Sequence, residues 1–360
     1  MTTRRKFIAT TALTGVAAAT SGTFAAAQTA PKPGQHYRPP IKLGLGGVAI
    51  GNGFKVTPDA EADEALEAAW DAGFRYFDTS PFYGMGLSER RFGHFLDDKK
   101  PEDYTISTKI GRLLVPDRSS ENGLWKGTLN FKYKYDYSAA GARRSVEDSL
   151  QRLGIPSIDI VFIHDLSPDN GDMKENWTEY FETAAKGAMP ELSKMRDEGL
   201  IKGWGMGVNT PQPILKALEV ADPDIFLAAT QYSLMEHEKA LTGLFPAIEK
   251  SGTSLIIGAP LNFGFLAGRD RFNYGSTIPD GYLEKREKMS AIAKEHGTDL
   301  RTAALQFTAA PAVVSATIPG ARTAEQARQN AASLEAGIPV EFWAALKKAN
   351  LIAQDTPEPG

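Results

Sequence analysis

The sequence predicts an α/β fold, a single (β/α)8 barrel. Segments typical of strands and of helices alternate eight times between residues 41 and 335, which is the element order of a parallel barrel. No proline-rich or glycine-rich linker interrupts this alternation, so we expect one domain. The alternative is an open doubly wound sheet, which usually has fewer strands and carries a dinucleotide-binding fingerprint in its first turn.

Short apolar runs predict the strands, and amphipathic segments predict the helices between them. Residues 59–72 illustrate the helical signal, because Ala62, Leu66 and Ala69 share one helix face and Gly73 follows as a stop. We expect strands at 41–46, 75–79, 104–109, 159–163, 201–207, 225–231, 254–259 and 314–318. We expect helices at 59–72, 86–97, 138–153, 178–198, 212–221, 239–251, 282–296 and 323–335.

The first predicted loop contains a sequence that imitates the dinucleotide-binding fingerprint. Residues 44–49, Gly-Leu-Gly-Gly-Val-Ala, have the spacing G-x-G-x-x-A. In a doubly wound fold a helix would begin here, whereas Gly51 and Gly53 continue the loop and the first helix begins near Pro58. We therefore interpret the segment as a glycine-rich loop whose backbone approaches a ligand closely.

The amino-terminal segment predicts export rather than fold. Arg4 and Arg5 form a twin-arginine pair, residues 8–19 are weakly apolar, and small residues precede Gln28. We interpret the segment as a signal that directs the folded protein through the twin-arginine export machinery to the periplasm; a basic N-terminus on a cytosolic protein is the alternative. The apolar stretch is too short for a stable membrane anchor. The predicted organisation is a signal peptide at 1–27, an N-terminal tail at 28–40, the barrel domain at 41–352 and a C-terminal tail at 353–360.

The composition argues against several classes of partner and site. The formal net charge of −4 gives no basic surface for nucleic acid or for an anionic membrane. The chain has no cysteine, which rules out disulfides, thiolate nucleophiles and cysteine-ligated zinc or iron–sulfur sites. A chain without cysteine also fits an oxidising compartment.

Two longer segments, at 112–137 and 165–177, interrupt the regular alternation. Each follows a predicted strand, so in a barrel both would lie on the rim where the carboxyl ends of the strands form active sites. The first segment carries Trp125. Its lysine–tyrosine alternation at 132–137 is equally typical of a surface hairpin.

Titratable residues follow the ends of three successive predicted strands. Asp78 comes at the end of the second strand, with Tyr83 five residues later. Lys109 ends the third strand and His164 follows the fourth. Each residue alone has an ordinary structural explanation, as a helix cap, a packed ring, a solvated ammonium or a core imidazole. Because neighbouring parallel strands lie about 5 Å apart, we expect the four side chains to converge.

These residue types support proton transfer near neutral pH without a metal. A free phenol titrates near pH 10, so Tyr83 needs help to act as an acid or a base at neutrality. We expect Lys109 to lie against Tyr83, to stabilise the phenolate and to lower its pKa. Asp78 would keep the lysine charged, and a neutral His164 would donate a hydrogen bond to the substrate oxygen.

The segment 78–84, Asp-Thr-Ser-Pro-Phe-Tyr-Gly, together with Lys109 and His164, resembles the catalytic signature of the aldo-keto reductases. The resemblance covers nearly all of the chain after the predicted signal peptide. It implies a (β/α)8 barrel and metal-free hydride transfer between a nicotinamide cofactor and a carbonyl or an alcohol. It also implies that the four residues are catalytic, with Tyr83 as the general acid and base.

The resemblance extends to segments that bind the cofactor in this family. Asn209 and Gln231 match residues that hydrogen-bond the nicotinamide amide, residues 259–268 match the loop beside the pyrophosphate, and residues 318–330 match the adenosine-binding region. The cofactor-binding residues that it implies are Gly46, Gly47, Asp78, Asn209, Gln231, Ala259, Pro260, Leu261, Asn262, Ile318, Gly320, Arg322, Gln326 and Asn330.

Five positions bear on how the cofactor is packed and selected. Gly258 stands where many relatives carry an aromatic residue that stacks on the nicotinamide, and Gly47 stands where a threonine is common. Trp204 would either supply the missing surface or be a core residue. Arg322 and Arg328 lie in the expected adenosine region and favour NADP(H) over NAD(H), because arginine recognises a 2′-phosphate.

Further stretches resemble the aldose 1-dehydrogenase group, which includes fucose, threo-aldose and pyridoxal dehydrogenases. These stretches are 107–114, 163–166 and 185–188. The resulting hypothesis is an NAD(P)-dependent oxidoreductase for an aldose or another small aldehyde or alcohol, with Phe82, Trp125 and His164 in contact with the substrate. The alternatives are a broad NADPH-dependent aldehyde reductase and a nicotinamide-nucleotide-binding accessory or sensor protein without turnover.

Overall fold

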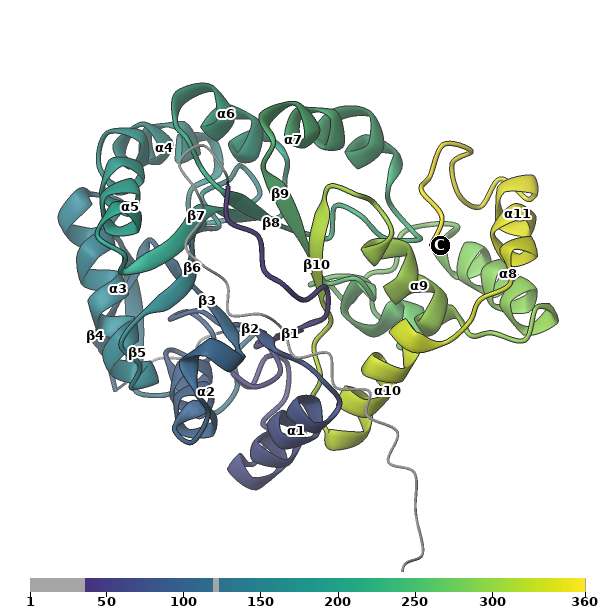
Figure 1. Ribbon diagram of the computed structural model, residues 1–360, viewed down its shortest axis with the longest axis horizontal. Coiled ribbons are helices and arrows are strands. Elements are labelled where there is room, and N and C mark those ends of the chain that lie inside the picture. Colours follow the sequence, from purple (N-terminus) through teal and green to yellow (C-terminus); the bar gives the residue numbers. More distant parts are fainter. Residues whose placement is uncertain (1–35, 119–122, 360) are drawn as a thin grey trace, which may run out of the picture.

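The computed structural model describes residues 36–118 and 123–359, and it contains the predicted barrel (Figure 1). Eight parallel strands form one sheet, in chain order around the barrel. Isolated bridges between Leu43 and Thr317 and between Gly46 and Gly320 join the first strand to the last, so the sheet closes on itself and the (β/α)8 prediction is confirmed. The strands are β1 (Gly44–Gly46), β2 (Tyr76–Asp78), β3 (Thr105–Ile110), β6 (Ile158–His164), β7 (Ile201–Val208), β8 (Ile225–Ala229), β9 (Ser254–Gly258) and β10 (Val314–Ile318).

Helices lie between the strands in the chain and surround the barrel, while α8 and α11 lie together at one end of the molecule (Figure 1). The α-helices are α1 (Asp59–Asp71), α2 (Leu87–Leu96), α3 (Ala139–Leu153), α4 (Trp177–Lys186), α5 (Ala188–Asp197), α6 (Gln212–Val220), α7 (Phe245–Ser251), α8 (Tyr282–Glu295), α9 (Leu300–Ala309), α10 (Ala324–Glu335) and α11 (Val340–Lys348). Shorter helical turns are η1 (Pro101–Asp103), η2 (Lys174–Asn176), η3 (Ala240–Leu244) and η4 (Asn262–Ala267).

The predicted helix at 178–198 is two helices, α4 and α5, which meet at Gly187. Pro190 lies in the first turn of α5. Its ring has no N–H and would clash with the carbonyl of Lys186 in a continuous helix, so the chain bends before it.

Helices α9 and α11 have no counterpart among the predicted helices. The sequence does carry a start signal for α9, because the Asp299 side chain accepts a hydrogen bond from the backbone N–H of Thr302 at 3.0 Å. The segment 132–137 had two interpretations, and both hold: β4 (Arg112–Pro116) pairs antiparallel with β5 (Phe131–Tyr135) as a hairpin, and Tyr133 of this hairpin reaches Phe82 after β2.

Side chains inside the barrel form an apolar cluster of their own. Alternate residues of a strand point to opposite faces. In β6, Ile160 and Phe162 belong to this interior cluster, whereas Val161 and Ile163 pack in the larger cluster that includes the helices. Tyr37, which precedes β1, is buried in the interior cluster as well. The barrel interior is therefore a packed core and not a pore.

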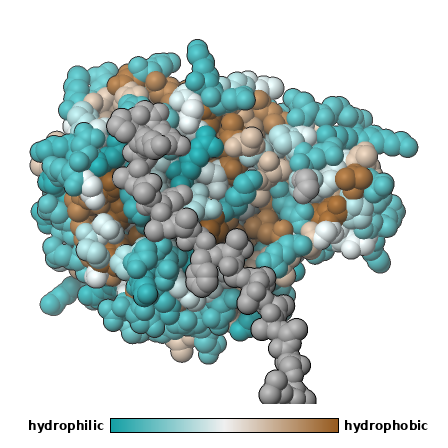
Figure 2. All heavy atoms as spheres, in the orientation of Figure 1, coloured by the Kyte–Doolittle hydropathy of each residue, from teal (hydrophilic) through white to brown (hydrophobic). Residues whose placement is uncertain are grey.

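The face of the molecule in Figure 2 is mainly hydrophilic, with apolar residues in separate patches. Within the two described ranges, no helix combines the length and the apolar character that crossing a membrane requires. The predicted signal peptide, residues 1–27, lies outside the described residues and stays a prediction.

Gly205 in β7 lies where the neighbouring strand leaves no room for a side chain. A Cβ at this position would lie 1.8 Å from the carbonyl oxygen of Ile225 in β8. We expect Gly205→Ala to lower the free energy of unfolding by about 3 kcal/mol or to prevent folding, because the barrel can relieve the clash only by moving strands. Gly243→Ala is the control, since a Cβ there meets nothing within 4 Å. Denaturation followed by circular dichroism checks both variants, and equal midpoints would contradict this explanation.

Candidate active site

Asp78 and Lys109 form a buried ion pair near the carboxyl ends of β2 and β3. Lys109 Nζ donates hydrogen bonds to Asp78 Oδ1 (2.9 Å) and Oδ2 (2.8 Å) and to the carbonyl of Thr79 (2.7 Å). Ser107 Oγ donates to Asp78 Oδ1 at 2.7 Å. The ammonium thus places all three of its protons, and the two side chains are only 1% and 2% exposed.

Tyr83 and His164 lie beside this ion pair. Lys109 Nζ is 4.6 Å from the centroid of the Tyr83 ring, and the ring centroids of Tyr83 and His164 are 5.9 Å apart. Asp78, Tyr83, Lys109 and His164 are therefore brought together at one end of the barrel, from three neighbouring strands and the loop after β2.

Ser80 orients the His164 ring. Ser80 Oγ accepts a hydrogen bond from the backbone N–H of Phe82 at 3.1 Å and lies 3.1 Å from His164 Nδ1. Its own O–H is then available to donate to Nδ1, which favours the tautomer with the proton on Nε2. Burial, and then the charges of Arg112 and Lys109, hold the pKa of His164 well below its usual value. This agrees with the neutral imidazole that the sequence led us to expect.

The expected effect of Lys109 on Tyr83 is not found in this structure. Burial raises the pKa of Tyr83 well above its usual value, and the neighbouring Asp78 raises it further. Lys109 does not offset this rise, because its protons go to Asp78 and to Thr79 and not to the Tyr83 hydroxyl. Tyr83 is therefore a neutral phenol, and a proton donor, at neutral pH.

Three aromatic side chains form a wall beside these residues. The ring of Phe82 lies 6.1 Å from that of His164 and 5.3 Å from that of Trp125, which in turn lies 5.3 Å from Tyr83. Tyr133 of β5 lies 5.2 Å from Phe82. We call Phe82, Trp125 and Tyr133 the aromatic wall. Tyr133 was not predicted as a site residue, although the lysine–tyrosine alternation of its strand is evident in the sequence.

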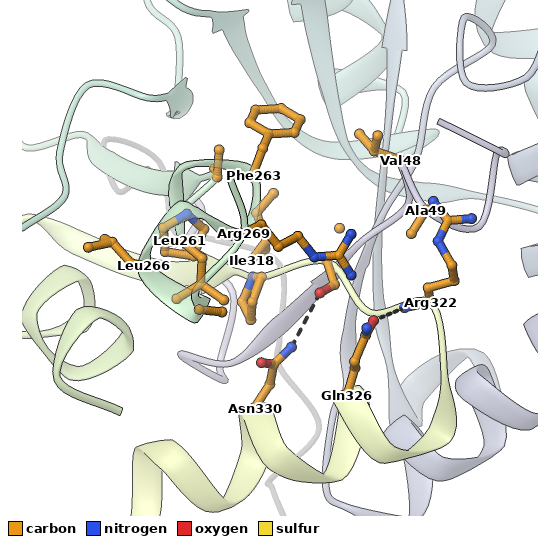
Figure 3. Close-up of a pocket in the computed structure, with 18 of the residues that line it drawn as sticks. Val48, Ala49, Leu261, Phe263, Leu266, Arg269, Ile318, Arg322, Gln326 and Asn330 are labelled. Atoms are coloured by element: carbon orange, nitrogen blue, oxygen red, sulfur yellow. Dashed lines mark hydrogen bonds between the residues drawn. The ribbon is translucent and has the colours of Figure 1, made fainter. Parts of the chain in front are cut away.

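A cavity of about 600 Å³ begins at Asp78 and Tyr83 and reaches α10 (Figure 3). Gln326 Oε1 accepts a hydrogen bond from the backbone N–H of Arg322 at 2.8 Å, and Asn330 Nδ2 donates to the carbonyl of Gly320 at 3.3 Å. Predicted cofactor-binding residues in the lining are Gly46, Asp78, Ala259, Pro260, Leu261, Ile318, Gly320, Arg322, Gln326 and Asn330.

Two predicted cofactor-binding residues, Asn209 and Gln231, are hydrogen-bonded to each other and do not line the cavity. The Gln231 side-chain amide donates to the carbonyl of Asn209. The Asn209 side chain donates to Asp169 at 3.0 Å and accepts from the Tyr274 hydroxyl at 3.1 Å. Both side chains therefore have protein partners where the family resemblance implies a nicotinamide amide.

The other two predicted residues outside the lining, Gly47 and Asn262, have packing roles. A Cβ at Gly47 would lie 2.6 Å from the carbonyl oxygen of Asp78, so the glycine lets the first loop pack against β2. Asn262 is buried, and its side chain donates to Asn273 at 3.0 Å.

Leu227, Ala229 and Gly258 form an apolar side of the cavity at the carboxyl ends of β8 and β9. Trp204 lies elsewhere: it is fully buried, and its Nε1 donates to Ser193 of α5 at 3.1 Å. Of the two interpretations of Trp204, the core residue is therefore confirmed.

Four arginines line the cavity: Arg301 donates to Gln329 of α10, and Arg269, Arg271 and Arg322 lie near one another. Arg322 Nη2 donates to the carbonyl of Gly53 at 2.7 Å, and Arg271 lies 3.7 Å over the Phe54 ring. Arg269 points across the cavity toward Arg322 (Figure 3), and its guanidinium has no ion pair or hydrogen bond in the described part of the chain. Burial lowers the pKa of Arg322 and of Arg271, and repulsion from Arg269 adds to the effect. An anion bound among them would relieve this repulsion.

Arg269 and Arg271 were missed at the sequence level, although they directly follow the predicted pyrophosphate loop at 259–268. Arg328, which was considered for cofactor selection, is exposed on α10 and does not line the cavity. No set of three or more histidine, aspartate or glutamate side chains could hold a metal ion in residues 36–118 and 123–359.

The lining fits a nicotinamide dinucleotide. Its apolar side near Tyr83 suits a flat ring, five glycines among the lining residues let the backbone approach a ligand, and the guanidinium groups at the other end suit phosphates.

Comparisons with known proteins agree with the geometry. The sequence profile of the aldo/keto reductase family matches residues 42–351. Pyridoxal 4-dehydrogenase from Microbacterium luteolum is 38% identical over 328 residues, which is 86% of this chain and 94% of that protein. D-threo-aldose 1-dehydrogenase from a Pseudomonas species is 35% identical over 321 residues, again 86% of this chain and 94% of that protein.

Solved structures share the fold. The glycerol dehydrogenase from Gluconobacter oxydans has a TM-score of 0.66 at 24% identity and covers 91% of this chain and 98% of its own. An aldo-keto reductase from Klebsiella pneumoniae in complex with NADPH has a TM-score of 0.62 at 22% identity and covers 89% of this chain and 94% of its own.

The Asp78–Lys109 pair should show strong energetic coupling. We expect Asp78→Asn and Lys109→Met each to destabilise the protein by about 3 to 5 kcal/mol, because each leaves one buried charge without its partner. The double variant lacks both charges of the pair and should be far more stable than the sum of the single effects predicts. Denaturation midpoints of the four proteins measure the coupling, and additive losses would rule out a tight pair.

Proposed function

The chain belongs to the aldo/keto reductase family and is an NAD(P)-dependent oxidoreductase; we propose that it transfers hydride between the nicotinamide and C1 of an aldose or the reacting carbon of another small aldehyde or alcohol. The observation that carries this proposal is the convergence of Tyr83, Lys109 and His164 at the end of a cavity suited to a dinucleotide. Because the chain is an oxidoreductase of this family, the alternative of a nucleotide-binding sensor without turnover is set aside.

In the proposed chemistry, Tyr83 transfers one proton: it accepts the proton in oxidation and donates it in reduction. When bound, the nicotinamide accepts or supplies the hydride. In the oxidation of a cyclic aldose, C1 loses a hydride and its hydroxyl loses a proton to the phenolate form of Tyr83, which leaves a lactone and a neutral Tyr83. In the reduction of an aldehyde, Tyr83 gives its proton to the oxygen as the carbon gains the hydride.

The neighbours of Tyr83 support these steps. His164, with a proton on Nε2, would donate a hydrogen bond to the substrate oxygen. Lys109 lies 4.6 Å from the ring centroid of Tyr83, and Asp78 keeps the ammonium in place beside the ring. The four residues thus act as one unit around a single oxygen.

The substrate class is proposed from the aromatic wall and from the relatives. Phe82, next to His164, and Tyr133 are partly exposed, so their rings offer flat apolar surface against which the C–H face of a sugar or a planar ring can stack; Trp125 is buried against Phe82. Two relatives are named for pyridoxal and for a threo-aldose, and both compounds offer such a face.

A second candidate is a broad NADPH-dependent aldehyde reductase. The protonated state of Tyr83 favours it, because reduction needs a proton donor and the pKa of Tyr83 is raised. Comparison of kcat/KM for aldose oxidation and for the reduction of simple aldehydes separates the two candidates.

For the cofactor, we propose that NADP(H) is preferred to NAD(H). Arg269 supports the preference, because its guanidinium faces the cavity and has no hydrogen bond or ion pair among the described residues. Arg322 is less available, since its guanidinium donates to the carbonyls of Gly53 and Lys55 at 2.7 and 2.8 Å.

The pH dependence of oxidation tests the role of Tyr83. The raised pKa means that the basic phenolate is a minor species at neutral pH and grows about tenfold per pH unit. We expect kcat/KM for oxidation to rise with a slope near one between about pH 7 and 9, and kcat/KM for reduction to stay nearly constant there.

Tyr83→Phe should lower kcat by about 100-fold to 10,000-fold and abolish the slope. Tyr282→Phe is the matched control, since Tyr282 lies on α8 and bonds Glu236. Steady-state rates read at the nicotinamide absorbance decide the matter: near-normal activity of Tyr83→Phe would end the proposal.

Arg269 should distinguish the two cofactors. Arg269→Ala should weaken NADP⁺ binding by about tenfold and NAD⁺ binding by much less, because a charge-assisted contact to phosphate is lost. Arg328→Ala, which removes the same charge from an exposed position, should leave both affinities unchanged. Fluorescence titration with each cofactor checks this, and equal losses for both cofactors in Arg269→Ala would argue against a 2′-phosphate contact.

A further inference from the structure

We propose that Asp165, held by Arg112, recognises the hydroxyl next to the reacting carbon, so that the site selects aldoses and 2-hydroxyaldehydes over their 2-deoxy analogues. This inference rests on the proposed function and names the feature of the substrate that the site reads.

Asp165 directly follows His164 and shares its surroundings. Asp165 Oδ2 lies 3.4 Å from His164 Nε2, the nitrogen that is proposed to donate to the substrate oxygen. In a 2-hydroxyaldehyde or an aldose, the two oxygens on neighbouring carbons are about one hydrogen-bond length apart. A substrate that bonds Nε2 with its reacting oxygen therefore brings the neighbouring hydroxyl within reach of the carboxylate.

One oxygen of Asp165 is fixed and the other is available. Oδ2 accepts a hydrogen bond from Arg112 Nη1 at 2.9 Å. Oδ1 has neither an ion pair nor a hydrogen bond within the described ranges, and the side chain is 23% exposed. A carboxylate with one free oxygen is an acceptor for a hydroxyl and offers no donor to a carbonyl.

Arg112 acts as a positioning residue for this carboxylate. Its guanidinium is buried, lies 4.2 Å over the Phe82 ring, and donates to the Tyr135 hydroxyl at 3.3 Å. Burial raises the pKa of Asp165, and the ion pair with Arg112 is the main effect that opposes the rise. The pair is neutral as a whole, which suits an uncharged polyhydroxylated substrate and not an anionic one.

The backbone at Asp165 is strained, which indicates that its position is enforced. Its φ of 44° lies in the left-handed region, which aspartate and asparagine tolerate better than most side chains. The strained conformation is held by a hydrogen bond from its N–H to the carbonyl of Gly207 and by one from Asn170 Nδ2 to its carbonyl, both 2.9 Å. Such strain persists only where the surroundings hold it.

The test compares substrates that differ by one hydroxyl. Lactaldehyde and propanal are reduced, and galactose and 2-deoxygalactose are oxidised, with kcat/KM measured for each. We expect the wild-type protein to prefer the hydroxylated member of a pair by roughly tenfold to a hundredfold, as a hydrogen bond to a charged group predicts. Asp165→Asn keeps a residue that tolerates this φ and should bring the preference close to one, mainly by raising KM for the hydroxylated member.

Two further variants make the test specific. Asp172→Asn removes a carboxylate from the same loop, where it accepts hydrogen bonds from Tyr133 and Tyr135, and should keep the preference. Arg112→Lys keeps the charge but loses the planar fork, so it should reduce the preference in part.

The outcomes separate the two proposals. If Asp165→Asn lowers kcat/KM equally for both members of a pair, or leaves the preference unchanged, Asp165 does not read the hydroxyl. If neither sugar is turned over while lactaldehyde is preferred to propanal and the preference depends on Asp165, the aldose part of the proposed function fails and the inference stands. If Asp165→Asn does not fold by circular dichroism, Arg112→Lys carries the same comparison, and an unaltered preference in that variant overturns the inference.

Discussion

The buried Asp78–Lys109 ion pair is the interaction on which the site depends. Two charges at this depth are tolerable only because each has several partners: the ammonium donates to both carboxylate oxygens and to the Thr79 carbonyl, and Ser107 donates to Asp78. These bonds fix the ammonium under the Tyr83 ring. They also use up its protons, so the rise in the Tyr83 pKa that burial and Asp78 cause is not offset by Lys109, and the hydroxyl keeps its proton.

The alternation of strands and helices predicted the barrel, because each element can be recognised from the hydrophobic periodicity of its own segment. The catalytic group followed from the same logic: Asp78, Lys109 and His164 end or follow neighbouring parallel strands, so their convergence depends only on strand order. The direction in which Lys109 donates its protons is a tertiary property, and the expected shift of the Tyr83 pKa was wrong for that reason.

Loop residues were harder to predict than strand ends. Arg269, Arg271 and Tyr133 reach the site from long connections whose path is set by contacts with other loops, such as Arg271 with Phe54. Helix ends behaved differently: the division of α4 from α5 could have been predicted from Gly187 and Pro190 by local rules alone. The chemical type of each residue could be read from the sequence, whereas the distant residue that it contacts could not be predicted.

The closure of the barrel between β10 and β1 has a consequence for the whole molecule. This seam is joined by two isolated bridges, and Arg322 reinforces it by bonding the loop after β10 to the carbonyls of Gly53 and Lys55. Gly46 and Gly320, on the two sides of the seam, both line the cavity. A ligand that fills the cavity therefore contacts both sides of the seam between β10 and β1. Because it binds only the folded barrel, the free energy of unfolding should rise as the cavity becomes saturated.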